Sequence, residues 1–181
     1  MIILCDIDNV VCDTTAAILT QYNEEYNDNL TIDDIKTYWM ERYVKPEAKE
    51  KFYEFFLKKE TWKRVKPIEE NIKGIQWLID NGHDVYFVTA TWSDNLKKKS
   101  NFLKRCFKNI DVEDKLIKSN HKELILGSVI IDDYTRNIIM SKCPTKVCIK
   151  YPWNEDYEKY YDGDRWSSVI EWVNDEFNAG I

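Results

Sequence analysis

Three short apolar runs in this chain each end in an acid or a hydroxyl, and this pattern constrains the fold more than any other feature. The runs are residues 1–5, 85–88 and 129–131, and the side chains that follow them are Asp6 and Asp8, Thr89, and Asp132 and Asp133. Short, β-branched apolar runs of this kind are typical of buried strands in a parallel sheet. Because helical patterns separate the runs, the sequence predicts an α/β fold with a Rossmann-like parallel sheet flanked by helices.

The carboxyl ends of parallel strands meet at one edge of the sheet, which is where ligands bind in open α/β folds. We therefore expect the four carboxylates and the Thr89 hydroxyl to converge there. Such a cluster repels itself unless a cation neutralises it, and carboxylate oxygens suit Mg²⁺. A lone Asp-x-Asp is commonly a turn or a helix cap. The prediction of a site therefore depends on matching chemistry at all three strand ends.

Composition excludes several classes of protein. A chain of 181 residues with 44% hydrophobic and 32% charged side chains is typical of one globular core. The net charge of −6 disfavours a nucleic-acid polymer or an anionic membrane as the partner. Neither a membrane-spanning run nor a charged leader before the first strand is visible, and the five cysteines show no C-x-x-C spacing. These features favour reduced thiols and a cytoplasmic location.

Residues 14–66 contain no further strand pattern, and we expect them to form a small helical cap inserted after the first strand. A helix is predicted from 14 to 26, Thr31 and Asp34 resemble a capping box, and a helix after Pro46 carries Phe52, Phe55, Phe56 and Lys59 at helical spacing. Residues 1–13 and 67–181 would then form the α/β core. Its predicted helices include one that Ser93 caps and that buries Leu96, Leu103 and Phe107, and a last one over residues 166–177.

Asp6 and Asp8 have the spacing of a pair of catalytic carboxylates. In an extended strand both would face the same side, whereas a turn after Ile7 would place them around one reacting centre. One carboxylate would attack a phosphorus atom while the other handles the proton of the leaving group. Thr89 offers a hydroxyl and nearby backbone N–H groups, and Lys122 offers a cation, although a solvated helix face is a competing interpretation of this lysine.

These residues resemble the motifs of the haloacid-dehalogenase-like hydrolase superfamily, in the order Asp6-Ile7-Asp8-Asn9-Val10, Thr89, Lys122 and Asp132-Asp133. Within it, the chain is most similar to the 5'(3')-deoxyribonucleotidases. The further similar stretches are residues 6–13, Tyr38-Trp39, residues 62–67, residues 119–122, residues 130–133, Pro152-Trp153-Asn154 and Arg165-Trp166. The resemblance thus spans nearly the whole chain.

The resemblance implies a role for each motif residue. Asp6 would be the nucleophile that forms an aspartyl-phosphate, and Asp8 the general acid and then the base that activates water. Mg²⁺ would be held by Asp6, by the backbone carbonyl of Asp8 and by Asp132, with Asp133 in support. Thr89 and Lys122 would hold the phosphate. The base and sugar would lie in an aromatic pocket made of Tyr38, Trp39 and Trp62, closed by the cap.

The sequence departs from the family pattern near the expected substrate. Asn9 replaces the usual Gly and tolerates the left-handed conformation of such a turn. Thr14 replaces an aromatic residue, Ala90 a Ser, and Tyr134-Thr135 an Arg-Pro pair. These departures leave the nucleotide preference open. Trp39 and Trp62 are equally compatible with packing between cap and core.

The predicted function is that of a Mg²⁺-dependent phosphomonoesterase acting on (deoxy)nucleoside monophosphates. One alternative keeps the chemistry and changes the substrate to a sugar phosphate or another small phosphoester. Another is a non-catalytic nucleotide-binding protein, which would have no need of Asp6 and Asp8 beside an acidic metal pair. The many aromatic side chains suit a homodimer face as well as a pocket, so the sequence leaves open whether the protein is a monomer or a homodimer.

Overall fold

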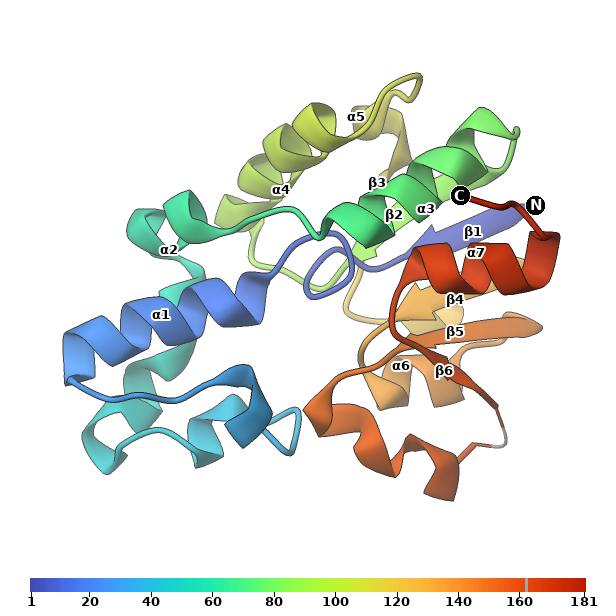
Figure 1. Cartoon of the computed structure of the whole chain (residues 1–181). Helices are drawn as coiled ribbons and strands as arrows, with labels where there is room; N and C mark the ends of the chain where they lie inside the picture. The colour runs from blue at the N-terminus through green and yellow to red at the C-terminus, as the bar shows by residue number, and fades with distance from the viewer. Residues whose placement is uncertain (162) are drawn as a thin grey trace.

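The computed structural model describes residues 1–161 and 163–181, and its centre is a six-stranded parallel sheet (Figure 1). The strand order is β3-β2-β1-β4-β5-β6. The strands are β1 (Ile2–Cys5), β2 (Asp84–Thr89), β3 (Leu116–Lys118), β4 (Val129–Asp132), β5 (Thr145–Ile149) and β6 (Arg165–Trp166). Every strand pairing is parallel. The predicted α/β class is therefore confirmed.

Apolar cores lie on both faces of the sheet because alternate side chains of each strand point to opposite sides. Ile3 and Ile131 belong to one core cluster, and Leu4 and Ile130 to the other. The larger core is covered by α3 (Glu69–Asp80), α4 (Ser93–Cys106), α5 (Val112–Lys115) and α7 (Val169–Phe177), and the smaller by α6 (Thr135–Met140) and the 3₁₀ helix η5 (Pro152–Lys159). Gly74 lets α3 approach α7, because a Cβ there would lie 2.7 Å from the backbone nitrogen of Ile170.

The chain between β1 and α3 contains helices and no strand, and Figure 1 shows them as a separate lobe beside the sheet. The lobe comprises α1 (Thr14–Tyr26), α2 (Lys59–Arg64) and the 3₁₀ helices η1 (Ile32–Asp34), η2 (Met40–Arg42) and η3 (Pro46–Phe56). It has its own apolar cluster, in which Tyr22 meets Phe52 and Phe55 edge to face. This lobe occupies the span predicted for the cap.

Three local predictions were wrong. The helix after Pro46 is a 3₁₀ helix that ends at Phe56, because Lys58 is extended (φ −65°, ψ 134°), and Lys59 instead begins α2. Ser93 makes no capping bond and is the first residue of α4, which follows Trp92. The last helix begins only at Val169, because Trp166 pairs with Ile149 in the edge strand β6.

Candidate active site

Asp6 and Asp132 lie side by side because β1 and β4 are neighbours, with Cys5 opposite Ile131 in the register. Lys122, the first residue of the 3₁₀ helix η4 (Lys122–Leu124), bridges the two carboxylates. Its Nζ lies 2.8 Å from Asp6 Oδ1 and 2.8 Å from Asp132 Oδ2. All three side chains are buried. The structure thus brings together the predicted nucleophile, the predicted phosphate-binding lysine and the first acid of the fourth motif.

A tight turn after Ile7 redirects the chain, which is the second of the two conformations considered for Asp6 and Asp8. The carbonyl oxygen of Ile7 accepts hydrogen bonds from the backbone N–H groups of Val11 (2.8 Å) and Cys12 (3.1 Å). Asn9 adopts a positive φ of 57°, which Asn tolerates better than most residues. The Asp6 and Asp8 carboxylates therefore both line one cavity.

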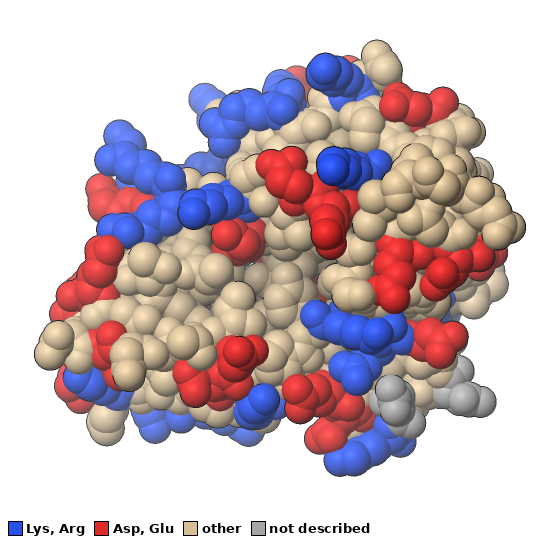
Figure 2. Space-filling view, in the orientation of Figure 1, with Lys and Arg blue, Asp and Glu red and all other residues tan. Residues whose placement is uncertain are grey.

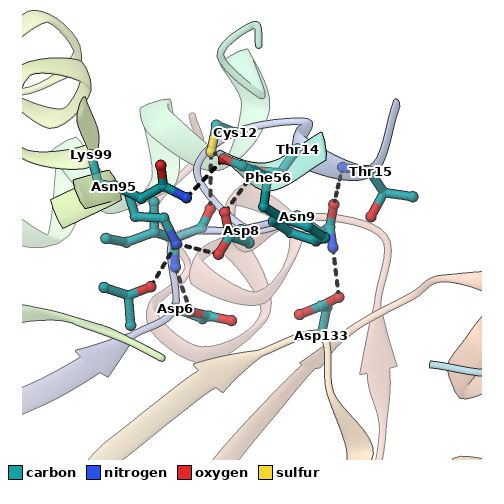
Figure 3. A network of polar contacts seen from close by, with 12 residues as sticks. Asp6, Asp8, Asn9, Cys12, Thr14, Thr15, Phe56, Asn95, Lys99 and Asp133 are labelled. Atoms are coloured by element: carbon teal, nitrogen blue, oxygen red, sulfur yellow. Dashed lines mark hydrogen bonds and ion pairs between the residues drawn. The ribbon is translucent and has the colours of Figure 1, made fainter. Parts of the chain in front are cut away.

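Lys99 is the functional candidate that the sequence did not reveal. It lies on α4 with 2% of its surface exposed, and it donates to Asp8 Oδ2 and, at 2.7 Å, to Thr89 Oγ1 (Figure 3). The second oxygen of Asp8 accepts from Thr14 Oγ1 at 2.7 Å. Both oxygens of the predicted acid–base residue are thus held, one by a cation and one by a hydroxyl.

Lys99 could have been found from the buried face of α4, which differs from the face predicted from the sequence. The buried residues of this helix are Asn95, Lys99, Phe102 and Leu103, whereas Leu96 is half-exposed. Lys99 is the last of three consecutive lysines, and such a run is typical of a solvent-exposed helix surface. Thr89 is wholly buried and points to Lys99, and its side chain is not among those that line the cavity.

Asp6, Asp132 and Asp133 form the one candidate metal site found among the described residues, with one carboxylate oxygen of each within 4.8 Å of the others. Such oxygens are the ligands that hard divalent cations prefer. No described donor bonds to Asp6 Oδ2 or to Asp133 Oδ1, so both oxygens remain available to a cation. The donor set fits a metal ion, and the carboxylate oxygen of Asp133 lies as close to the cluster as those of Asp6 and Asp132.

Neutral donors hold the remaining carboxylate oxygens in place. Asp132 Oδ1 accepts from the backbone N–H of Tyr134 (2.9 Å), and its Oδ2 accepts from Asn137 Nδ2 (3.0 Å) as well as from Lys122. Asp133 Oδ2 accepts from Trp153 Nε1 (3.0 Å) and Asn9 Nδ2 (3.1 Å). These partners fix the orientation of both carboxylates, and the oxygen of Asp133 that they leave unbonded is Oδ1.

The protonation of the cluster follows from burial and crowding. Burial raises the pKa of Asp6 to about 7 against the opposing charge of Lys122, and the nearby Asp132 and Asp8 add to the rise. Burial, together with Asp132 and Asp6, also raises the pKa of Asp133 well above its usual range. Burial works against the charge of Lys122, but Asp132 and Asp6 hold its pKa above the ordinary value. The carboxylates therefore outweigh the lysine, and a bound cation would relieve their repulsion.

An open cavity of about 870 Å³, counted to its mouth, lies over the acids. We call the charged lining residues Asp6, Asp8 and Lys122 the base of the cavity. Its larger lining side chains form what we call the wall: Tyr38, Met40, Tyr53, Phe56, Trp92 and Trp153. Of the three predicted pocket aromatics, Tyr38 lines the cavity and Trp39 and Trp62 do not. Trp62 instead packs against the core with its Nε1 donating to the Phe56 carbonyl (2.7 Å), and Trp39 meets Tyr38 edge to face.

Solved structures share the fold of this chain. A haloacid-dehalogenase-family hydrolase from Deinococcus radiodurans, solved with bound phosphate and sodium, matches with a TM-score of 0.66, 15% identity, and coverage of 98% of this chain and 95% of that one. A β-phosphoglucomutase-like structure from Thermotoga maritima matches with a TM-score of 0.67, 12% identity, and coverage of 98% and 99%. These likenesses show that the chain has the fold of the haloacid-dehalogenase-like proteins.

Sequence comparison narrows the class to one family. The profile of the 5' nucleotidase, deoxy (pyrimidine), cytosolic type C proteins (NT5C) matches residues 1–176. A 5'(3')-deoxyribonucleotidase from Clostridium acetobutylicum is 30% identical over 135 residues, which are 74% of this chain and 73% of that protein. The chain belongs to this nucleotidase family and is a phosphoric monoester hydrolase. None of its described helices is long and apolar enough to cross a membrane.

Proposed function

We propose that the protein removes phosphate from (deoxy)nucleoside monophosphates, with Mg²⁺ as its metal and the cytoplasm as its location. One observation carries the proposal: a single cavity joins the Asp6–Asp8–Lys122 base to an aromatic wall. Charged groups at the base suit a phosphoryl group, and the rings suit a planar base. The 5'(3')-deoxyribonucleotidase activity named for the Clostridium relative supports the substrate class.

The first half of the reaction transfers the phosphoryl group to the protein. The backbone N–H of Ile7 and the Nζ of Lys122 bind Asp6 Oδ1 and orient the carboxylate, which supplies the attacking oxygen. A bond forms from this oxygen to phosphorus as the bond from phosphorus to the nucleoside oxygen breaks, and Asp8 gives that oxygen its proton. Lys122 neutralises charge at the phosphoryl oxygens, and the bound Mg²⁺ would add electrophilic stabilisation of the same charge.

The second half restores Asp6. Asp8, now a carboxylate, takes a proton from a water molecule whose oxygen attacks the phosphorus of the aspartyl-phosphate. The bond between phosphorus and the Asp6 oxygen breaks as the bond to water forms, inorganic phosphate leaves, and Asp8 is protonated again for the next cycle. Lys99 and Thr14 hold the Asp8 carboxylate between them and so fix its direction toward the reacting centre.

The helical lobe supplies part of the cavity wall, which supports a role for residues 14–66 as a cap. Tyr38, Met40, Tyr53 and Phe56 come from this lobe. Closing it over a substrate would exclude water and strengthen the electrostatic interactions below. Figure 2 shows Lys and Arg side chains gathered over α2 and α4. Lys98 on α4 reaches the chain next to the cavity residue Phe56, because its Nζ donates to the carbonyl of Leu57 at 3.0 Å. This local positive charge favours an anionic substrate although the whole chain is acidic.

The test is phosphate release from a panel of 5'- and 3'-deoxynucleotides, ribonucleotides and sugar phosphates, with Mg²⁺ and with a chelator. We expect chelator-sensitive release from nucleoside monophosphates and its loss in Asp6→Asn, whose folding is checked by thermal unfolding. Release from sugar phosphates alone would overturn the nucleotide assignment and leave the chemistry. An Asp6→Asn variant that still turned over would overturn the proposed nucleophile.

A further inference from the structure

Asn9 uses one planar amide to join two parts of the molecule. Its Nδ2 donates to Asp133 Oδ2 at 3.1 Å, and its Oδ1 accepts the backbone N–H of Thr15 at 3.1 Å (Figure 3). Asp133 is one of the three candidate metal ligands, and Thr15 lies in the first turn of α1, the helix that begins the cap lobe. A single side chain thus contacts both the acidic cluster and the cap.

The contact to α1 replaces a missing helix cap. The first N–H groups of a helix need acceptors from outside the helix. Asp13, at the N-cap position, makes no capping bond with its side chain, because its Oδ1 accepts the N–H of Lys66 instead. The amide oxygen of Asn9 takes over one of these N–H groups. The start of α1 therefore depends on a residue of the catalytic turn.

The hydrogen bond from Asn9 to Asp133 determines which carboxylate oxygen of Asp133 is left free for the acidic cluster. Asn9 and Trp153 both donate to Oδ2, which leaves Oδ1 as the oxygen without a described donor. Asp133 is 2% exposed, so water does not readily replace a lost donor. Partners of this kind orient metal ligands and commonly affect metal affinity by about 10- to 100-fold.

We propose that Asn9 is a positioning residue, an inference that rests on the proposed function. It orients Asp133 toward the metal, and it couples metal binding to the docking of α1 against the catalytic turn. Because the amide is rigid, a shift of α1 moves the group that holds Asp133. The reverse also holds, since linkage requires metal binding to stabilise the seated helix by the same free energy.

The Asn9→Gly variant tests the proposal with little backbone strain, because Gly readily adopts the φ of 57° found there. Asn109→Gly is the matched control: Asn109 also has a positive φ (61°), and its amide donates to a surface carboxylate, Asp80, at 3.3 Å. Mg²⁺ binding is measured by calorimetry on the substrate-free protein. We expect the Mg²⁺ dissociation constant to rise about tenfold or more in Asn9→Gly and to change less than twofold in Asn109→Gly.

Two further readouts separate positioning from a general structural role. Saturating Mg²⁺ should restore kcat of Asn9→Gly to near the wild-type value, because the reacting groups remain. Mg²⁺ should slow hydrogen exchange of the Thr15 amide in the wild type and not in Asn9→Gly. Unchanged Mg²⁺ affinity in Asn9→Gly, or equal slowing of exchange in both proteins, would overturn the inference. A wild type that binds Mg²⁺ and hydrolyses no nucleotide would overturn the proposed function alone.

Discussion

The base and the wall of the cavity are built from different kinds of contact. At the base and directly beneath it, Asp6, Asp8 and the buried Asp132 each accept at least two directional hydrogen bonds or ion pairs from neighbouring groups. Along the wall, Tyr38 and Trp92 are 41% and 49% exposed and are held by ring contacts. Directional bonds in a buried site fix geometry for chemistry. Exposed rings allow the wall to adjust to the shape of a substrate.

The two regions also differ in how far they are tied to the rest of the molecule. The base is assembled from strand ends of the core, which the sheet register holds. The wall combines the cap lobe with the core, and the stack of Tyr38 on Tyr134 (ring centroids 3.6 Å apart, planes at 16°) crosses between them. Substitutions at the base should therefore lower the rate of the chemical step (kcat), and substitutions in the wall should change mainly substrate binding (KM).

Lys99→Met should produce the largest effect of the variants below. It leaves the Asp8 carboxylate without its cation and beside the other acids, so we expect kcat to fall about 100-fold or more. Lys97→Met, an exposed neighbour on the same helix, is the control and should keep normal turnover. Steady-state kinetics at saturating Mg²⁺ measure both. Equal kcat values for the two variants would show that Lys99 has no part in the reaction.

The metal-free protein should lose stability as the pH rises. The pKa of Asp6 is about 7 in the folded chain and about 3.9 in an unfolded one. Between these values the native state holds a proton that the unfolded chain has released, so the free energy of unfolding falls with rising pH. We expect Tm in chelator to drop by about 5–10 °C from pH 5 to pH 8, which corresponds to about 2.5 kcal/mol in a domain of this size.

Two additions identify the source of this pH dependence. In Asp6→Asn the slope should be much reduced, because the titrating group is gone. Mg²⁺ should restore stability most at pH 8, where the carboxylates are ionised. A Tm that rises between pH 5 and pH 8 in chelator would contradict the assignment of the raised pKa.

Tyr134→Ala should act on binding more than on chemistry. The stack with Tyr38 contributes about 0.5–1.5 kcal/mol, so its loss should raise KM by about 2- to 13-fold while kcat changes less. Tyr134→Phe keeps the ring and should remain close to wild type. The comparison fails if Tyr134→Ala lowers kcat strongly at unchanged KM, because the wall would then take part in the chemical step.

Trp39→Leu should have the smallest effect. Trp39 does not line the cavity and is 46% exposed, so we expect KM within about twofold of the wild type, as for most surface substitutions. Tyr38→Leu, which removes a wall residue, is the contrasting variant and should raise KM clearly. A larger KM for Trp39→Leu than for Tyr38→Leu would favour the pocket that the family resemblance implied.

Much of the fold and of the base was predictable because its signals are local. The apolar runs before Asp6, Thr89 and Asp132 identify strands by their short length and β-branched composition, and parallel strands end at a common edge. The absence of a strand pattern over residues 14–66 likewise matches the helices found there. The family resemblance, rather than a local pattern, predicted that Lys122 joins Asp6 and Asp132, and its Nζ lies 2.8 Å from an oxygen of each.

The partners of these residues were decided only by the tertiary structure. Lys99 and Asp8 are 91 positions apart, and Asn9 and Asp133 are 124 apart, so no sequence period joins them. The wall residues Tyr53 and Trp92 are likewise distant in the sequence and come from different lobes, so no local pattern predicts that they line one cavity. Local periodicity therefore determined which elements form and where their acids emerge. The packing of distant elements decided which lysine meets which acid, because that choice depends on burial and distance in three dimensions.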